Sequence, residues 1–321
     1  MNITVIGSGR WGSFIAWYLS RKKFNVTVCG RADSAHFAAL AETRKNEFVA
    51  FDDSVSFSTD FISSIKGADV VIISISSQAL RGFLNGLGSE VFKGKKVVLC
   101  MKGIEESTGK RLTEIAVECG IDRDSVAVWV GPGHIQEFLA LHPNCMLIDS
   151  SNPVLTKELA DAFRSDIIRF YYGDDLIGSE IGAAAKNVMG IAAGMLDGAG
   201  YSTLKGALMA RGAREVARLI KAMGGNELSA YGLCHLGDYE TTLFSKYSNN
   251  RGYGEAFIKG EKFVKLAEGV STAKAMKLLG ERYGVELPIT NAVYRVLYEG
   301  ADFIKTFGEL FNRSTKEEFY K

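Results

Sequence analysis

The sequence predicts a two-domain α/β protein, with a doubly wound sheet over residues 1–177 followed by an all-helical domain over residues 178–321. Short β-branched runs alternate with helical patterns in the first half, as expected of βαβ units. The strand pattern stops after about Ile177, and helical periodicity continues from there. A chain of 321 residues is also long for one typical domain.

The expected strands are four to six residues long and nearly continuous in apolar residues, a pattern typical of strands buried on both faces of a parallel sheet. They are Ile3–Ile6, Asn25–Cys29, Val70–Ile75, Val97–Met101, Val126–Val130 and Cys145–Ile148. Amphipathic segments between them are expected to be helices, namely Gly12–Ser20, Gln78–Leu87 and Gly109–Cys119.

Long helices are expected in the second half, because only Pro288 follows Pro153. A helix that starts near Gly178 is expected to join the two domains rigidly. The helical segments predicted after it are Ile181–Leu196, Leu204–Met223, Tyr253–Lys265, Thr272–Tyr283 and Thr290–Tyr298, followed by a polar C-terminal segment.

Composition restricts the class of protein. The 38 basic and 37 acidic residues give a net charge of +1, whereas nucleic-acid binders usually carry a strong basic excess, so we expect no nucleic-acid partner. Five scattered cysteines without a CxxC pair are typical of a reducing compartment. We expect no signal segment, because the N-terminus runs straight into the strand pattern of residues 2–6. We expect no membrane span, because Lys186, Asn187 and Asp197 interrupt the most apolar stretch, 181–200. The cysteine pattern and the expected lack of a signal segment and of a membrane span together predict a cytoplasmic location. The histidines show no metal spacing, so we expect no metal site.

A glycine-rich turn joins the first strand to the first helix and reads Gly7-Ser8-Gly9-Arg10-Trp11-Gly12. In such a turn Gly7 permits the sharp bend, Gly9 lets the backbone approach a pyrophosphate, and Gly12 lets the helix pack closely on the strand. The helix N-terminus then presents its N–H groups to the phosphates. The segment therefore predicts a Rossmann-type site for a nicotinamide dinucleotide.

The end of the second strand bears on the choice of cofactor. NAD-specific enzymes usually place Asp or Glu there to bind the ribose hydroxyls, and this chain has Gly30-Arg31 instead. An arginine can pair with a 2′-phosphate or stack on adenine, so NADP binding at least equal to NAD binding is predicted. The alternative is that Arg31 is a solvated surface residue.

Ordered motifs extend along nearly the whole chain: GSGRWG (7–12), SSQALRGFL (76–84), KGIE (102–105), GPGHIQE (131–137), GSEIGAAAKNVMGIAAGMLDG (178–198), ARGAREVARL (210–219), LGD (236–238), SNNRGYG (248–254) and EG (268–269). Together they resemble the bacterial NAD(P)-dependent glycerol-3-phosphate dehydrogenases. The resemblance implies reversible reduction of dihydroxyacetone phosphate, a small phosphorylated partner, to sn-glycerol 3-phosphate for glycerophospholipid synthesis. The apolar faces of the helical domain favour a homodimer.

Lys186 lies among small residues, where a helix can approach another element or a ligand closely. Burial without a carboxylate would lower the pKa of its ammonium group and make proton transfer near neutrality feasible. The resemblance implies that Lys186 donates a proton to the ketone oxygen and that Asp238 orients the substrate and the lysine. On chemistry alone, Lys186 could instead extend its ammonium group to solvent from a helix end, and Asp238 could be a helix cap.

Further contacts follow from the resemblance. Lys102, after a strand at the carboxyl edge of the sheet, is expected to bind substrate and to lie near the cofactor. Glu268 matches a position near the cofactor, with an exposed loop residue as the alternative. The remaining substrate contacts are expected from Gly131, Gly133, Ser248, Asn249, Asn250 and Arg251. His134 is interpreted as a residue that lines the pocket, and Asn187 as structural.

Two departures from the family pattern bear on the substrate. Asn249 stands where the family has an arginine in Ser-Arg-Asn, and Gly133 replaces its Ser or Thr after Gly-Pro. Arg251 is one candidate for the missing positive charge at a helix N-terminus. Two other functions stay open: a related dehydrogenase for another short hydroxy or keto compound, and a non-catalytic redox sensor that binds the dinucleotide.

Overall fold

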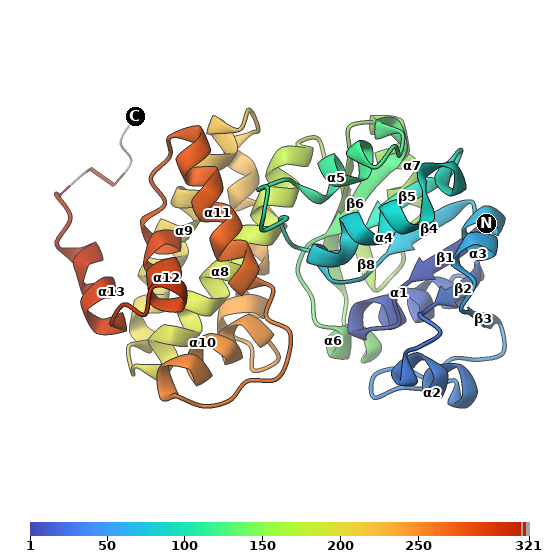
Figure 1. The fold of residues 1–321 in the computed structure, drawn as a ribbon, viewed down its shortest axis with the longest axis horizontal. Coiled ribbons are helices and arrows are strands. Elements are labelled where there is room, and N and C mark those ends of the chain that lie inside the picture. The colour runs from blue at the N-terminus through green and yellow to red at the C-terminus, as the bar shows by residue number, and fades with distance from the viewer. Residues whose placement is uncertain (316, 319–321) are drawn as a thin grey trace.

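The structure is a computed structural model that describes residues 1–315 and 317–318. The chain forms an α/β domain followed by a helical domain, side by side along the long axis of the molecule (Figure 1). The predicted fold class is therefore confirmed. The predicted boundary between residues 177 and 178 falls in the first turn of α8 (Leu176–Gly198), the helix that leads from one domain into the other.

The sheet has the strand order β3-β2-β1-β4-β5-β6-β7-β8, so the chain reverses direction of travel between β1 and β4. All neighbouring pairs are parallel except β6 with β7, which is antiparallel. The strands are β1 (Asn2–Ile6), β2 (Asn25–Cys29), β3 (Val55–Ser58), β4 (Val70–Ile73), β5 (Lys96–Leu99), β6 (Val126–Val130), β7 (Asn144–Ser150) and β8 (Ile168–Tyr172).

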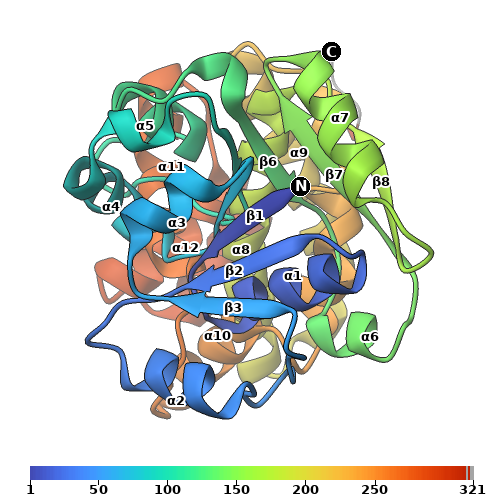
Figure 2. The same cartoon turned by 90° about the vertical axis from the view of Figure 1, so that its right-hand side faces the viewer.

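Helices cover both faces of the sheet, as Figure 2 shows. One face carries α3 (Phe61–Gly67), α4 (Leu80–Leu87) and α5 (Leu112–Glu118), and the other carries α1 (Arg10–Arg21), α6 (Ile135–Leu139) and α7 (Pro153–Phe163). Helix α2 (Ala35–Thr43) packs Phe37 and Leu40 into the second face. This two-sided cover explains why the central strands read as continuous apolar runs.

The two outermost strands were missing from the sequence prediction. β3 reads VSFS and β8 reads IRFYY, and each exposes part of its length. Edge strands are buried less completely than central ones, so polar residues replace the continuous apolar run on which the prediction depended. The sheet is consequently wider than the sequence suggested.

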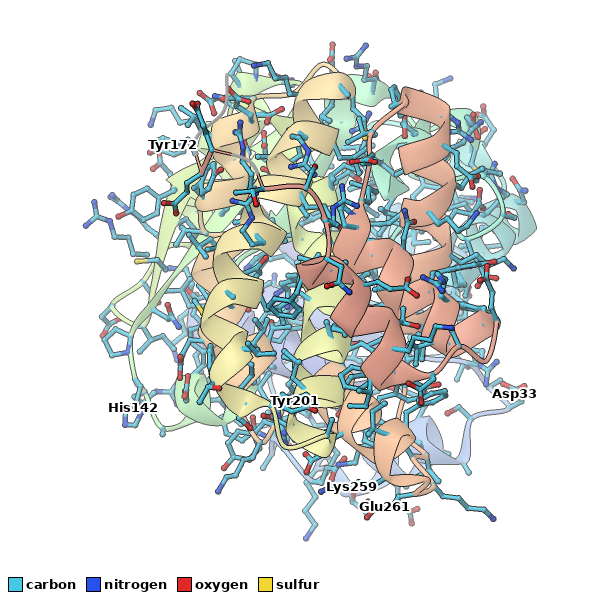
Figure 3. All side chains as sticks on the ribbon, turned by 90° about the vertical axis from the view of Figure 1, so that its left-hand side faces the viewer. Asp33, His142, Tyr172, Tyr201, Lys259 and Glu261 are labelled. Atoms are coloured by element: carbon cyan, nitrogen blue, oxygen red, sulfur yellow. The ribbon has the colours of Figure 1, made fainter. Side chains whose placement is uncertain are left out.

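The helical domain is built around α8, of which 19 residues are buried. Helices α9 (Lys205–Ala222), α10 (Asn249–Lys259), α11 (Gly269–Tyr283), α12 (Pro288–Tyr298) and α13 (Phe303–Phe311) surround it (Figure 1). Glycines on α8 permit close contact with α10, because a Cβ at Gly194 would lie 1.9 Å from the Arg251 carbonyl oxygen. Figure 3 shows Tyr201, after α8, and Lys259, at the end of α10, near the same outer edge of the domain.

Two helical predictions were wrong in their limits. The segment predicted as Tyr253–Lys265 is α10, which begins at Asn249 because the Ser248 side chain accepts a hydrogen bond from the Arg251 N–H. It ends at Gly260, whose φ of +70° suits a residue without a Cβ. The segment predicted as simply polar contains the amphipathic α13, and its last positions, 316 and 319–321, lie outside the described residues.

Buried polar contacts fix α8 against the sheet domain. Glu180 accepts hydrogen bonds from the Thr113 N–H at 2.9 Å and from Arg111 Nη1 at 2.7 Å, at the start of α5. The residue before it, Ser179, donates to Asp149 at the end of β7. Since breaking a buried ion pair usually costs several kcal/mol, roughly 3–5, these contacts hold the two walls of the inter-domain cleft in register.

Candidate active site

A cleft of about 620 Å³ lies between the two domains. One wall is the carboxyl edge of the sheet, where β1, β4, β5 and β6 end, and the other comes from α8 and the segments 238–250 and 266–268. Open α/β sheets bind ligands at this edge, where the strand order reverses. The predicted site residues that line the cleft are Gly7, Gly9, Arg10, Trp11, Lys102, Gly133, Lys186, Asp238, Ser248, Asn249, Asn250 and Glu268.

The glycine-rich turn has the geometry that a pyrophosphate requires. Gly7 has φ +105°, and a Cβ there would lie 2.2 Å from the Ser74 carbonyl oxygen. A Cβ at Gly12 would lie 2.1 Å from the Gly7 carbonyl oxygen, whereas Gly9 faces open space. No side chain caps the first turn of α1 at Gly9, so its N–H groups are available to an anion. The residues present therefore fit a dinucleotide.

The remaining two residues of the turn are inside the fold. Ser8 is buried, and its carbonyl oxygen accepts a hydrogen bond from Ser13 Oγ. Gly12 packs on Gly7 and does not line the cleft. Both residues shape the turn, and the contact surface for a ligand comes from Gly7, Gly9 and the first helical residues.

Two lysines and one aspartate meet in the cleft. Lys186 Nζ lies 3.1 Å from Asp238 Oδ2 and donates to Thr242 Oγ1 at 2.8 Å. Lys102 Nζ donates to the same Asp238 oxygen at 2.8 Å and to the Gly131 carbonyl oxygen at 2.6 Å. Gly131 thus supports Lys102 through its backbone. Lys186 and Asp238 are only 6% and 1% exposed, so these charges interact in a largely water-free environment.

Burial and the neighbouring charges shift the pKa values of Lys186 and Asp238. Burial lowers the pKa of Lys186 to about 8, although the Asp238 carboxylate opposes this shift. The sequence argument assumed a lysine without a carboxylate, and the structure corrects it. Burial by itself raises the pKa of Asp238, but Lys102 and Lys186 outweigh burial and hold that pKa below its ordinary value. A lysine poised near neutrality can donate or accept a proton.

Two threonines complete the cluster and were missed by the sequence analysis. Thr241 Oγ1 donates to Asp238 Oδ1, and Thr242 accepts from Lys186. Both belong to a π-helical turn, Glu240–Phe244, that begins two residues after the aspartate. Such turns often occur at functional sites, but they have no clear pattern in a sequence. Their spacing of three and four residues from Asp238 was the only available signal.

A chain of amide hydrogen bonds connects the two walls. Asn187 Nδ2 donates to the Lys102 carbonyl oxygen at 2.8 Å, and Asn250 Nδ2 donates to Asn187 Oδ1 at 2.9 Å. Asn250 Oδ1 accepts from the Gly269 N–H at 2.9 Å. The neighbouring Glu268 accepts from Ser77 Oγ at 2.7 Å, next to the end of β4. These contacts position the lysines by fixing the backbone that carries them.

The residue after Gly131-Pro132 is glycine for a steric reason. Gly133 has φ +141°, and a Cβ there would lie 2.3 Å from the ring of Phe138. The ring of Phe138 stacks in turn on Phe14 at 5.1 Å between centroids. An aromatic cluster therefore occupies the space that a serine or threonine side chain would need. His134 lines the cleft, as interpreted from the sequence, and burial lowers the pKa of its ring.

The Ser248–Arg251 segment differs from its prediction at one position. Ser248 caps α10, and Asn249 Nδ2 donates to the Leu266 carbonyl oxygen at 3.1 Å. Arg251 does not line the cleft. Its guanidinium donates to Asp197 at 3.0 Å and to Glu255 at 2.7 Å, and it is mostly buried there. Arg251 is therefore held by carboxylates outside the cleft and does not replace the missing positive charge.

Arg31 lies at the end of β2 beyond the lining of the cleft, with its side chain 75% exposed. It forms an ion pair with Asp33 at 3.4 Å, and such exposed pairs are weak. Gly30, just before it, has no room for a side chain, because a Cβ would lie 2.2 Å from the Phe37 ring. No carboxylate can therefore occupy position 30 without displacing Phe37.

Over 1–315 and 317–318, no three His, Cys, Asp or Glu side chains come together as a possible metal site. Within the same part of the chain, no helix has both the length and the apolar character needed to cross a bilayer.

The fold and the cleft define a class: dinucleotide-dependent dehydrogenases with a Rossmann domain and a helical second domain. Residues 2–155 match the family described as NAD-dependent glycerol-3-phosphate dehydrogenase N-terminus, and residues 175–307 match its C-terminus. The chain belongs to the NAD-dependent glycerol-3-phosphate dehydrogenase family. The resemblance inferred from the motifs is confirmed.

Individual relatives are similar to this chain over at least nine-tenths of their length. The chain is 37% identical to glycerol-3-phosphate dehydrogenase [NAD(P)+] of Prosthecochloris aestuarii, with 99% of this chain and all of that protein aligned. It is 36% identical to the enzyme of the same name from Moorella thermoacetica, over 93% and 92% of the two chains. The crystal structure of the Coxiella burnetii glycerol-3-phosphate dehydrogenase superposes with a TM-score of 0.89 at 27% identity, covering 97% and 99%.

Proposed function

We propose that this protein interconverts dihydroxyacetone phosphate and sn-glycerol 3-phosphate with NAD or NADP, and that its product serves glycerophospholipid synthesis. The observation that carries the proposal is the buried Lys102–Asp238–Lys186 cluster, which faces the glycine-rich turn across one cleft. Membership of the family supports the same activity. A sensor that only binds the dinucleotide has no use for a lysine whose pKa is lowered to about 8.

Each residue has a defined part in the reduction. The reduced nicotinamide, when bound, supplies the hydride that adds to the ketone carbon. Lys186 in its ammonium form donates a proton to the ketone oxygen, so that the C=O bond becomes a C–OH group. Asp238 holds Lys186 in place and limits the fall of its pKa, while Lys102 contacts the substrate oxygens. In the reverse direction neutral Lys186 accepts the hydroxyl proton.

For the dinucleotide we propose contacts from Gly7, Gly9 and the first turn of α1, with Trp11 and Glu268 beside it. These residues line the same cleft as the lysines, which supports the assignment. We also propose that Arg31 receives a 2′-phosphate and makes NADPH at least as good a cofactor as NADH. Its exposed position after β2 and the glycine at position 30 support this choice.

The decisive experiment follows NADH or NADPH oxidation with dihydroxyacetone phosphate. Turnover well above background supports the proposal. Bound cofactor without turnover on this ketone would refute it, and a panel of 2-keto and 3-hydroxy acids then tests the second candidate, a dehydrogenase for another short substrate. That candidate is favoured by one observation: the Phe138 ring removes a hydroxyl-bearing side chain from position 133.

For the environment and assembly of the protein, we propose a cytoplasmic homodimer. Five free cysteines without a disulfide among the described residues fit a reducing compartment. Exposed apolar side chains on the helical domain, such as Leu228 and Val264, supply surface for a second copy. Sedimentation velocity at micromolar concentration distinguishes a dimer from a monomer.

A further inference from the structure

The charged side chains that line the cleft differ in whether an opposite charge pairs with them. Lys102 and Lys186 both contact Asp238, and Glu268 adds a second carboxylate to the lining. Within the part of the chain that the structure describes, Arg10 is the one other permanently charged residue of the lining. The two lysines are thus balanced by two carboxylates, and Arg10 supplies the net positive charge of the cleft.

The hydrogen-bond partners of Arg10 are uncharged. Its Nη1 donates to the Tyr247 carbonyl oxygen at 3.4 Å, and its Nη2 donates to Gln136 Oε1 at 3.2 Å. The Phe48 ring lies 5.9 Å from the guanidinium carbon. Among the described residues no carboxylate forms an ion pair with Arg10, in contrast to Arg251. The Glu47 carboxylate acts on Arg10 electrostatically and partly opposes the effect of burial on its pKa, but it forms no ion pair with it. A guanidinium without an ion-pair partner at the edge of a cleft is suited to an anionic ligand.

The direction of the Arg10 side chain indicates which of two anions it binds, the pyrophosphate of the cofactor or the phosphate of the substrate. The backbone N–H groups of the first turn of α1 suit the pyrophosphate of the cofactor. The Arg10 side chain leaves that turn and reaches across the cleft to Tyr247, two residues before Asn249. Position 249 is where the family resemblance places a phosphate-binding arginine. Arg10 therefore approaches the same region from the opposite domain.

We propose that Arg10 binds the phosphate group of the substrate and takes the place of the arginine absent from position 249. The proposal rests on the proposed function, because it assigns the phosphate of that substrate. It moves the phosphate-binding cation from the helical domain to the glycine-rich turn. Domain contact through Tyr247 then becomes part of substrate binding, since the same guanidinium touches both.

The main test uses Arg10→Gln, which keeps a hydrogen-bonding side chain and removes the charge. We expect KM for dihydroxyacetone phosphate to rise about tenfold or more, as for a lost charged hydrogen bond. For dihydroxyacetone, which lacks the phosphate, kcat/KM should stay within about twofold, and so should the Kd of NADH measured by fluorescence, because neither measurement involves the lost contact. Arg21→Gln, at the far end of the same helix, is the matched control.

A complementing variant tests the position directly. Asn249→Arg in the Arg10→Gln background should restore most of the affinity for dihydroxyacetone phosphate. An unchanged KM in Arg10→Gln overturns the proposal, as does an equal loss with dihydroxyacetone. A rise in the Kd of NADH without a rise in KM also overturns it, because Arg10 would then serve the pyrophosphate.

A binding measurement separates this proposal from the proposed function. Inorganic phosphate is titrated by calorimetry into the NADH-bound wild type and into NADH-bound Arg10→Gln. Loss of a phosphate-binding event in the variant supports the assignment of Arg10, and equal binding overturns it, whether or not the wild type turns over the ketone. Failure of the wild type to reduce dihydroxyacetone phosphate counts against the proposed function alone.

Discussion

Lys102 of the sheet domain and Asp238 of the helical domain form an ion pair across the cleft, with 2.8 Å between Nζ and Oδ2. The same carboxylate oxygen lies 3.1 Å from Nζ of Lys186. The pKa values of Lys186 and Asp238 therefore depend on the neighbouring charges, and the cluster exists only when the domains are in contact. Changes within it have opposite and measurable effects on the pKa of Lys186.

Replacing Lys186 by Met should remove proton transfer and leave the cofactor site intact. We expect turnover to fall by about 10²–10⁴, the usual range for a lost acid–base group. Fluorescence titration should give a Kd for NADH close to that of the wild type. A variant with more than a tenth of wild-type kcat would contradict the assignment of Lys186 as the proton donor.

The pH profile of ketone reduction follows from the direction in which Lys186 titrates. The ammonium form donates the proton, so kcat/KM should be high below about pH 8 and fall as the pH rises through the pKa of about 8. Oxidation of the alcohol requires the neutral amine, and its kcat/KM should rise through the same range. Parallel profiles in the two directions would argue against this role.

Substitutions of its two charged neighbours should move that pH midpoint in opposite directions. Asp238 raises the pKa of Lys186, so Asp238→Asn should shift the midpoint to lower pH. Lys102 lowers the pKa of Lys186, so Lys102→Met should shift the midpoint to higher pH. Both variants lose activity, and the midpoint of the residual activity is the measurement. Shifts of the same sign would be inconsistent with the cluster.

Arg31→Ala should discriminate between the two cofactors. We expect its Kd for NADPH to rise several-fold because a 2′-phosphate loses its cationic partner, while the Kd for NADH stays unchanged. The exposure of Arg31 limits the size of the effect. A wild type that prefers NADH, combined with an indifferent Arg31→Ala variant, would leave Arg31 as a surface residue.

Gly133→Ala should destabilise the fold. The new Cβ would lie 2.3 Å from the Phe138 ring, and φ of +141° is unfavourable for alanine, so we expect a loss of roughly 1–3 kcal/mol in the free energy of unfolding. Urea denaturation gives the value. Gly82→Ala is the control, because its Cβ would face open space in α4, where alanine is favoured over glycine in a helix. Equal effects at both positions would contradict the steric explanation.

The inner strands of the sheet could be predicted from the sequence, because their burial on both faces produces a local run of apolar residues. The strands Asn25–Cys29 and Val126–Val130 were placed at their observed limits, since strands covered on both faces are mostly apolar. The edge strands β3 and β8 were missed, since one side of each remains partly open. The start of α10 was misplaced, since a serine cap five residues before the predicted start sets it.

The sequence by itself determined the dinucleotide turn, the two-domain order and the lysines and aspartate of the cleft. Each of these depends on a local motif or on the order of motifs along the chain. Only the tertiary structure decided which of the two arginines, Arg10 or Arg251, lines the cleft. Arg251 pairs with Asp197, which is 11 residues beyond Lys186 on α8 and so about 16 Å farther along that helix.

Arg10 reaches the cleft instead, because its helix begins at the edge of the sheet that faces Tyr247. The sequence instead made Arg251 the candidate for this positive charge, because it is two residues from position 249, where the family has its arginine. The direction of a side chain is set by the packing of the helix that carries it, and α10 packs its Arg251 backbone against Gly194 of α8. That contact joins residues far apart in the chain, which no local pattern encodes.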